Sequence, residues 1–144
     1  MLTLRHLSRN TLISLAGLLV GIAGLVIQWF AEPSKFAEAL PPIGVAFPPG
    51  ILFIIASGLL MLLTARWWWH AVFGVFIGFW IVGVGTLANQ LTPNLTSDNP
   101  GTVAGNVIMA AGLILTVIVG VLSMITARRT RRTARSKPEP VHQR

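Results

Sequence analysis

Four long apolar runs without Asp, Glu, Lys or Arg constrain this chain more than any other feature. They cover residues 11–31, 48–65, 70–90 and 103–127. Each is close to the 17–25 residues that a helix needs to cross the hydrocarbon core of a bilayer. A continuous helix satisfies its backbone hydrogen bonds within lipid, and the runs lack the polar alternation of barrel strands. The pattern predicts an all-α membrane protein, with four transmembrane helices in a compact antiparallel bundle.

The composition supports a lipid-facing surface and a single domain. Charged residues make up only 10% of the 144 residues, whereas soluble domains carry about 25%. Residues 1–10 are then a cytoplasmic N-terminus, and residues 11–127 form the transmembrane domain. From residue 128 onward the chain is basic and has few apolar residues, so residues 128–144 are expected to form a disordered cytoplasmic tail.

The charged residues between the runs predict the orientation. One side of the membrane would hold ten basic residues and one acidic residue, a net charge of +9, and the other side one basic and three acidic residues, a net charge of −2. The positive-inside rule places the basic side, and with it both termini, in the cytoplasm. The preference for Arg over Lys and the spans rich in Ala, Gly and Val suggest a bacterial cytoplasmic membrane.

A cleaved signal peptide is the alternative for the first run. Arg5 and Arg9 precede this run, and Ala37-Glu38-Ala39 resembles a cleavage site. A signal peptide has an apolar region of about 7–15 residues with the cleavage site directly after it. The first run is longer and the Ala-x-Ala lies well beyond its end, so we expect this run to be retained as a span.

Small residues recur at spacings of three and four in every run, which places them on one face of each helix. Helices in lipid associate through close backbone approach at such residues. We therefore expect the faces to pack inside the bundle, although one face could instead meet a partner protein. The residues are Ser14, Gly17, Gly21, Gly24 and Gln28 in the first helix, Gly50, Ser57 and Thr64 in the second, Ala71, Gly74, Gly78, Gly85 and Ala88 in the third, and Gly105, Gly112, Thr116, Ser123 and Ala127 in the fourth.

Aromatic and basic residues cluster where the cytoplasmic ends of the spans should lie. Trp and Tyr concentrate at membrane interfaces, and a basic segment next to a span is attracted to anionic lipid. The tail has no aromatic residues for stacking on bases, so nucleic acid is not an expected partner. The expected lipid contacts are Trp67, Trp68, Trp69, Arg128, Arg129, Arg131, Arg132 and Arg135.

Amide side chains gather near the outer ends of the spans. Gln28, Asn89, Gln90 and Asn106 would line a shallow polar pocket open to the outside if they converge. The alternative is that each amide is solvated at the interface or bonds to a neighbouring helix.

Catalytic and coupling residues are missing from the spans. The chain has no Cys, and His6, His70 and His142 are far apart, so no catalytic residues, cofactor or metal site are expected. Ion-coupled transporters and pumps use ionisable groups within the bilayer, and these spans contain no Asp, Glu, Lys or Arg. We therefore expect a non-enzymatic accessory, scaffold or assembly subunit, with a membrane-protein partner or as a homo-oligomer. The alternative is a small transporter or channel subunit for a neutral or lipophilic solute.

Overall fold

The computed structural model describes residues 7–36 and 48–136, which are largely helical and contain no strand. The elements in chain order are α1 (Arg9–Ala31), the short 3₁₀ helix η2 (Pro33–Phe36), α2 (Pro49–Leu63), α3 (Val72–Gly78), the π-helical segment η3 (Phe79–Val84), α4 (Gly85–Leu87), α5 (Leu91–Leu95) and α6 (Pro100–Arg135).

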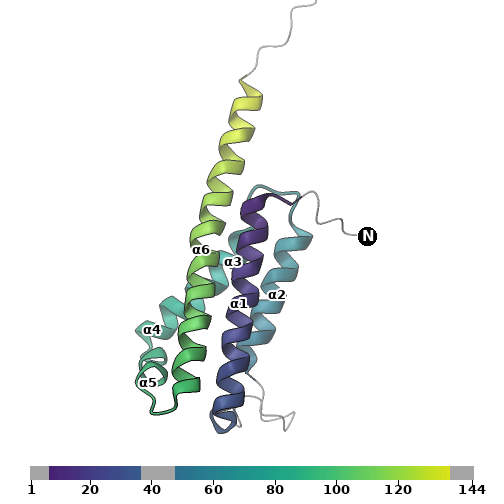
Figure 1. The fold of residues 1–144 in the computed structure, drawn as a ribbon. Helices are drawn as coiled ribbons and strands as arrows, with labels where there is room; N and C mark the ends of the chain where they lie inside the picture. Colours follow the sequence, from purple (N-terminus) through teal and green to yellow (C-terminus); the bar gives the residue numbers. More distant parts are fainter. Residues whose placement is uncertain (1–6, 37–47, 137–144) are drawn as a thin grey trace, which may run out of the picture.

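Helices α1, α2, α3 and α6 pack side by side, and successive helices run in opposite directions (Figure 1). The most extensive contact joins α1 to α6, which lie far apart in the sequence. Helix α3 packs against both α2 and α6, so the four helices enclose a common centre. The last turns of α6 project beyond the other helices (Figure 1).

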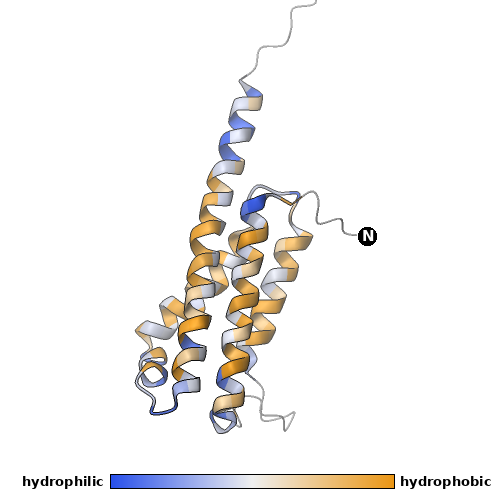
Figure 2. Ribbon diagram, in the orientation of Figure 1, coloured by the Kyte–Doolittle hydropathy of each residue, from blue (hydrophilic) through white to orange (hydrophobic). Residues whose placement is uncertain are grey.

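Two of the helices are long and apolar enough to cross a membrane. These are α1, with 23 residues, and α6, with 36 residues. Helix α2 and the continuous helical stretch Val72–Leu87 are apolar but shorter. Figure 2 shows apolar residues along all four helices, and hydrophilic residues on the projecting turns of α6 and at the start of α1.

Glycines bring the backbones of α1 and α6 into direct contact. A Cβ atom added at Gly112 would lie 2.6 Å from the carbonyl oxygen of Gly17, and one added at Gly24 would lie 2.5 Å from that of Gly105. No larger residue fits at such distances without moving a helix. The side chain of Thr116 adds a polar contact, because its hydroxyl donates to the carbonyl oxygen of Ser14 at 3.0 Å.

Apolar side chains fill the centre between the four helices. Ile54 and Met61 of α2 and Leu113 of α6 have no exposed surface, and Leu18 of α1 is also buried. The outward faces carry exposed large apolar side chains such as Leu19 and Phe76. The inside therefore resembles a protein core, and the outside suits an apolar solvent.

The third apolar run differs from a single straight helix over residues 70–90. Its α-helix begins at Val72, and six residues, Phe79–Val84, adopt π-helical geometry. The helix ends at Leu87 because Asn89 has a positive φ of 54°, a conformation that Asn tolerates at helix ends. The amide of Gln90 then donates to the carbonyl oxygen of Gly85 at 2.9 Å, which closes the helix end.

Helix α6 exceeds the expected 103–127 span at both ends. It begins at Pro100, where Asn99 caps it by accepting a hydrogen bond from the amide of Gly101 at 2.9 Å. It continues to Arg135, in contrast to the disorder expected from residue 128. Arg and Ala have high helix propensity, and extending an existing helix avoids the cost of nucleation. Residues 137–144 lie outside the described residues.

Candidate functional site

The two ends of the molecule differ in charge, and we name them accordingly. The basic end comprises the start of α1, residues 64–71 and the last turns of α6; its described charged residues are Arg9, Arg66, Arg128, Arg129, Arg131, Arg132 and Arg135. The acidic end comprises the end of α1, η2, α5 and the start of α6; its described charged residues are Glu32, Lys35 and Asp98. The charge asymmetry of the sequence is thus an asymmetry between two ends of one helical structure.

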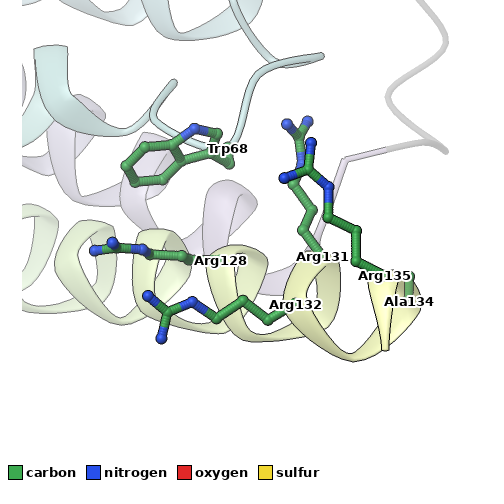
Figure 3. A pocket seen from close by; sticks show the side chains of 6 residues that line it. All are labelled: Trp68, Arg128, Arg131, Arg132, Ala134 and Arg135. Atoms are coloured by element: carbon green, nitrogen blue, oxygen red, sulfur yellow. The ribbon is translucent and has the colours of Figure 1, made fainter. Parts of the chain in front are cut away.

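Trp68 and four arginines line an open groove of about 550 Å³ at the basic end (Figure 3). The guanidinium carbon of Arg128 lies 5.8 Å from the centroid of the Trp68 ring, within cation–π range. Arg131 donates to the carbonyl oxygen of Arg66 at 3.3 Å. Two of the arginines are therefore held against residues 66–68, while Arg132 and Arg135 lie exposed on the projecting turns.

The other two tryptophans of this cluster lie beside the groove without lining it. The rings of Trp67 and Trp69 stack with centroids 5.1 Å apart. Trp67 is 52% exposed, and Trp69 is partly buried. A stacked tryptophan pair with one exposed ring next to arginines matches the composition of membrane interfaces.

A buried hydrogen-bond chain ties α1 to the segment before α3. His70 is 6% exposed, with its Nε2 2.8 Å from the hydroxyl oxygen of Thr11 and its Nδ1 2.8 Å from the carbonyl oxygen of Trp67. Since a carbonyl only accepts, Nδ1 carries a proton and Nε2 accepts from Thr11 in the neutral ring. Ser8, the residue that caps α1, lies 2.8 Å from the Thr11 hydroxyl and extends the chain.

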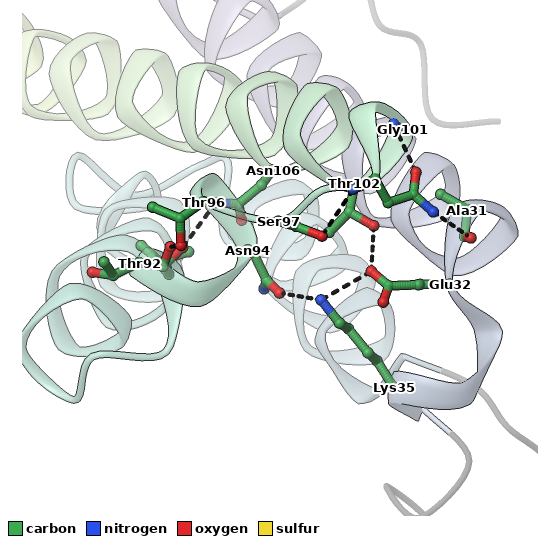
Figure 4. Close-up of polar contacts among 12 residues, drawn as sticks. Ala31, Glu32, Lys35, Thr92, Asn94, Thr96, Ser97, Gly101, Thr102 and Asn106 are labelled. Atoms are coloured by element: carbon green, nitrogen blue, oxygen red, sulfur yellow. Dashed lines mark hydrogen bonds and ion pairs between the residues drawn. The ribbon is translucent and has the colours of Figure 1, made fainter.

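Polar side chains at the acidic end join the residues after α1 to α5 and to the start of α6 (Figure 4). The hydroxyl of Thr102 donates to Glu32 at 2.6 Å, and Lys35 pairs with the same carboxylate at 2.9 Å. Lys35 also donates to the side-chain oxygen of Asn94 in α5 at 3.1 Å. The Thr102 hydroxyl, followed by Lys35, lowers the pKa of Glu32 below its ordinary value.

The amides of the expected outer pocket converge in part. Gln28, Gln90 and Asn106 line one cavity of about 390 Å³, together with Lys35 and Asn94. Asn89 does not line this cavity, because its φ of 54° places it in the turn that ends the third helix. Lys35 and Asn94 were not among the residues that the sequence predicted for this pocket. The spacing of Glu32 and Lys35, three residues apart, could have indicated their ion pair at this end. The position of Asn94 depends on how α5 folds back onto α6, which the sequence does not indicate.

Two of these amides are poorly satisfied by the described residues. Asn106 is 1% exposed, and its side-chain oxygen has no hydrogen-bond partner among residues 7–36 and 48–136. Its side-chain nitrogen reaches only the carbonyl oxygen of Leu91, at 3.5 Å. The side-chain nitrogen of Gln28 meets the sulfur of Met109 at 3.9 Å. A buried amide oxygen of this kind favours an occupant that can donate a hydrogen bond, and a water molecule is the smallest.

The acidic-end cavity reaches Ile81 of η3 and Met109 of α6, but no described residue lines both it and a basic-end cavity. At the basic end, a second cavity of about 400 Å³ is lined by Ser8, Arg66 and His70 among others. Buried Leu18, Ile54 and Leu113 occupy the interior between this cavity and the acidic-end cavity.

Most small residues of the expected packing faces lie between helices. All five from α1, namely Ser14, Gly17, Gly21, Gly24 and Gln28, are buried, as are Gly74, Gly78, Gly105 and Gly112. Gly85 is different: a Cβ atom added there would meet nothing nearer than Leu91, at 3.6 Å. It lies after the π-helical segment, where the third helix no longer approaches a neighbour as closely.

Within residues 7–36 and 48–136, no three His, Asp or Glu side chains lie close enough together to hold a metal ion. Comparisons of the chain with protein-family models, with curated proteins and with solved structures found no match. Its function is therefore inferred from its own residues.

Proposed function

We propose that this chain is a non-enzymatic accessory or scaffold subunit of a membrane complex. In this proposal α1, α2, the stretch Val72–Leu87 and α6 form a four-helix transmembrane bundle, with both termini in the cytoplasm of a bacterium. The basic end faces the cytoplasm and anionic lipid, and the acidic end faces outward, as the positive-inside rule requires. The partner is another membrane protein or a second copy of the chain.

The observation that carries the proposal is the filled interior. A transporter or channel needs a path along which a solute can cross the membrane, lined by groups that replace its hydration. Here Ile54, Met61 and Leu113 fill the centre, and glycine contacts hold α1 against α6. Such packing supports a structural role better than a conducting one.

The shorter helices fit this role. Helix α2 has 15 residues, which is slightly less than the hydrocarbon core requires, and a short span is accommodated by local bilayer thinning or by association with other helices. A neighbouring membrane protein would relieve this mismatch, which favours an assembled state over an isolated chain.

A small transporter for a neutral solute is the second candidate, and the acidic-end cavity favours it. This cavity brings together Gln28, Gln90 and Asn106, whose side-chain oxygen has no hydrogen-bond partner in the described part of the chain. It would serve as an outer vestibule if the helices also rearranged to open the centre.

The decisive experiment measures solute permeability in proteoliposomes containing the purified full chain. Rates of the re-swelling that follows osmotic shrinkage in glycerol and in urea should equal those of vesicles that hold an inert four-span protein at the same density. In parallel, mild-detergent extraction from native membranes should yield the chain in a complex of fixed stoichiometry. Re-swelling well above the control, together with a monomeric chain after extraction, would replace the scaffold proposal with the transporter.

A further inference from the structure

The groove at the basic end gathers four positive charges, and within residues 7–36 and 48–136 it is lined by no acidic side chain. Arg128, Arg131, Arg132 and Arg135 line it beside Trp68. The acidic residues that the structure describes, Glu32 and Asp98, belong to the opposite end of the molecule. Guanidinium groups this close repel one another, so an anion that enters the groove gains attraction and also relieves that repulsion.

Part of the groove is already held in place. Arg128 rests on the ring of Trp68 at 5.8 Å, and Arg131 is anchored to the carbonyl oxygen of Arg66 at 3.3 Å. Side chains that are ordered before binding lose less conformational entropy when a ligand arrives. A fully flexible basic tail offers no such preorganised site.

The face of α6 that carries the groove arginines is apolar on the turns directly before the groove. Its exposed residues follow spacings of three and four and cover about a third of the helix circumference; they are Ile118, Val121, Ile125, Arg128, Arg132 and Arg135. This face of α6 therefore changes from apolar to basic between Ile125 and Arg128. A phospholipid changes in the same way along its length, from apolar acyl chains to a charged headgroup.

We propose that this face binds one phospholipid whose headgroup carries a second phosphate extending away from the bilayer. The acyl chains lie along Ile118–Ile125, the phosphodiester meets Arg128, and the outer phosphate meets Arg132 and Arg135. Arg128 and Arg135 are seven residues apart, about 10 Å along the helix axis at 1.5 Å per residue. Guanidinium groups bind phosphate in a bidentate manner, which gives the site geometric selectivity.

This arrangement selects among lipids of equal charge. A lipid with two phosphodiesters at the same depth places both near Arg128 and leaves Arg135 empty. A headgroup with a phosphomonoester beyond its diester spans the arginines from Arg128 outward. Diffuse attraction of a basic segment to an anionic surface makes no such distinction.

The test uses the full chain in nanodiscs of phosphatidylcholine with one of three additions at matched total charge. These are phosphatidylglycerol, cardiolipin and phosphatidylinositol 4-phosphate. Native mass spectrometry then counts the lipids that remain on the protein after release. We expect phosphatidylinositol 4-phosphate to be retained at least fivefold more than the other two, with one molecule per chain. Equal retention of the three lipids would overturn the proposal.

Two matched variants locate the site. Arg132→Gln removes a groove arginine and should lower retention of phosphatidylinositol 4-phosphate roughly fivefold, the factor that about 1 kcal/mol per basic residue implies. Arg129→Gln removes the same charge from the exposed surface outside the groove and should change retention less than twofold. Equal effects of the two variants would mean diffuse attraction and would contradict a site.

An acidic protein segment is the other occupant that the test can detect. If Arg132→Gln weakens binding of a poly-glutamate peptide and leaves lipid retention unchanged, the groove binds protein and the lipid proposal is overturned. The inference rests on the membrane placement proposed above. A chain that does not incorporate into nanodiscs contradicts both, whereas a chain that incorporates without lipid preference contradicts only the lipid site.

Discussion

Polar residues at the two ends connect segments that are far apart in the sequence. At the basic end Thr11 of α1 and His70 share a buried hydrogen bond of 2.8 Å. At the acidic end Glu32 accepts from Thr102 at 2.6 Å. One contact lies at each end of the helical bundle. Hydrogen bonds are directional, so they fix the relative positions of the helix ends more narrowly than apolar packing alone does.

Glu32 gives a prediction about acid sensitivity. The hydroxyl of Thr102, followed by Lys35, lowers the pKa of Glu32 in the folded chain, while the unfolded chain keeps the ordinary value of 4.5. The charged carboxylate therefore stabilises the fold above pH 4.5, and this contribution disappears as the pH falls through the lowered value. The difference in thermal unfolding temperature between the parent chain and Glu32→Gln should shrink on acidification. A difference that stays constant from pH 7 to pH 3 would contradict this role of Glu32.

Residue types alone indicated part of the candidate site. The amides of Gln28, Gln90 and Asn106 were placed together because they recur at the same ends of predicted spans. Asn89 does not line the cavity that these three amides share, because it lies in the turn that ends the third helix. Contacts through Asn94 depend on how α5 folds back onto α6, which no local pattern indicates.

At the scale of whole helices, the small-residue faces were the most informative pattern. A spacing of three and four fixes which side of a helix can approach a neighbour, and the glycines of α1 and α6 do meet backbone to backbone. The π-helical segment Phe79–Val84 had no signal in the sequence, because its residues are as apolar as their neighbours. The continuation of α6 to Arg135 was not predicted, because the basic residues after 127 were taken to indicate disorder. A run of charges predicts contact with solvent, but it does not end a helix that has already formed.

The glycine contacts predict different outcomes for alanine at two positions. Gly24→Ala places a methyl group against backbone atoms of α6, 2.5 Å from the carbonyl oxygen of Gly105, and should destabilise the fold by about 1–3 kcal/mol. Gly58→Ala in α2 is the control, because its added Cβ would meet Leu18 at an ordinary 3.6 Å. It should be neutral or slightly stabilising, since Ala favours helix over Gly. Chemical unfolding in detergent measures both, and equal losses of stability would show that α1 and α6 are not in close contact.

At the scale of the whole molecule, apolar outward faces and a charge difference between the ends suit a chain inserted in one orientation. Helices α1 and α6 are long enough to cross a bilayer by themselves, and α2 and Val72–Leu87 would cross as a closely connected pair. The scaffold role and the lipid site both require the basic end to lie at one membrane surface.

Single cysteines test this placement most directly, since the chain has none of its own. Ser34→Cys and Thr96→Cys report the acidic end, and Ala65→Cys and Ser136→Cys report the basic end. In intact cells, a membrane-impermeant maleimide should label Ser34→Cys and Thr96→Cys. It should label Ala65→Cys and Ser136→Cys only after the membrane is permeabilised. Labelling of Ala65→Cys or Ser136→Cys from outside, or protection of either acidic-end position, would contradict four crossings with the basic end in the cytoplasm.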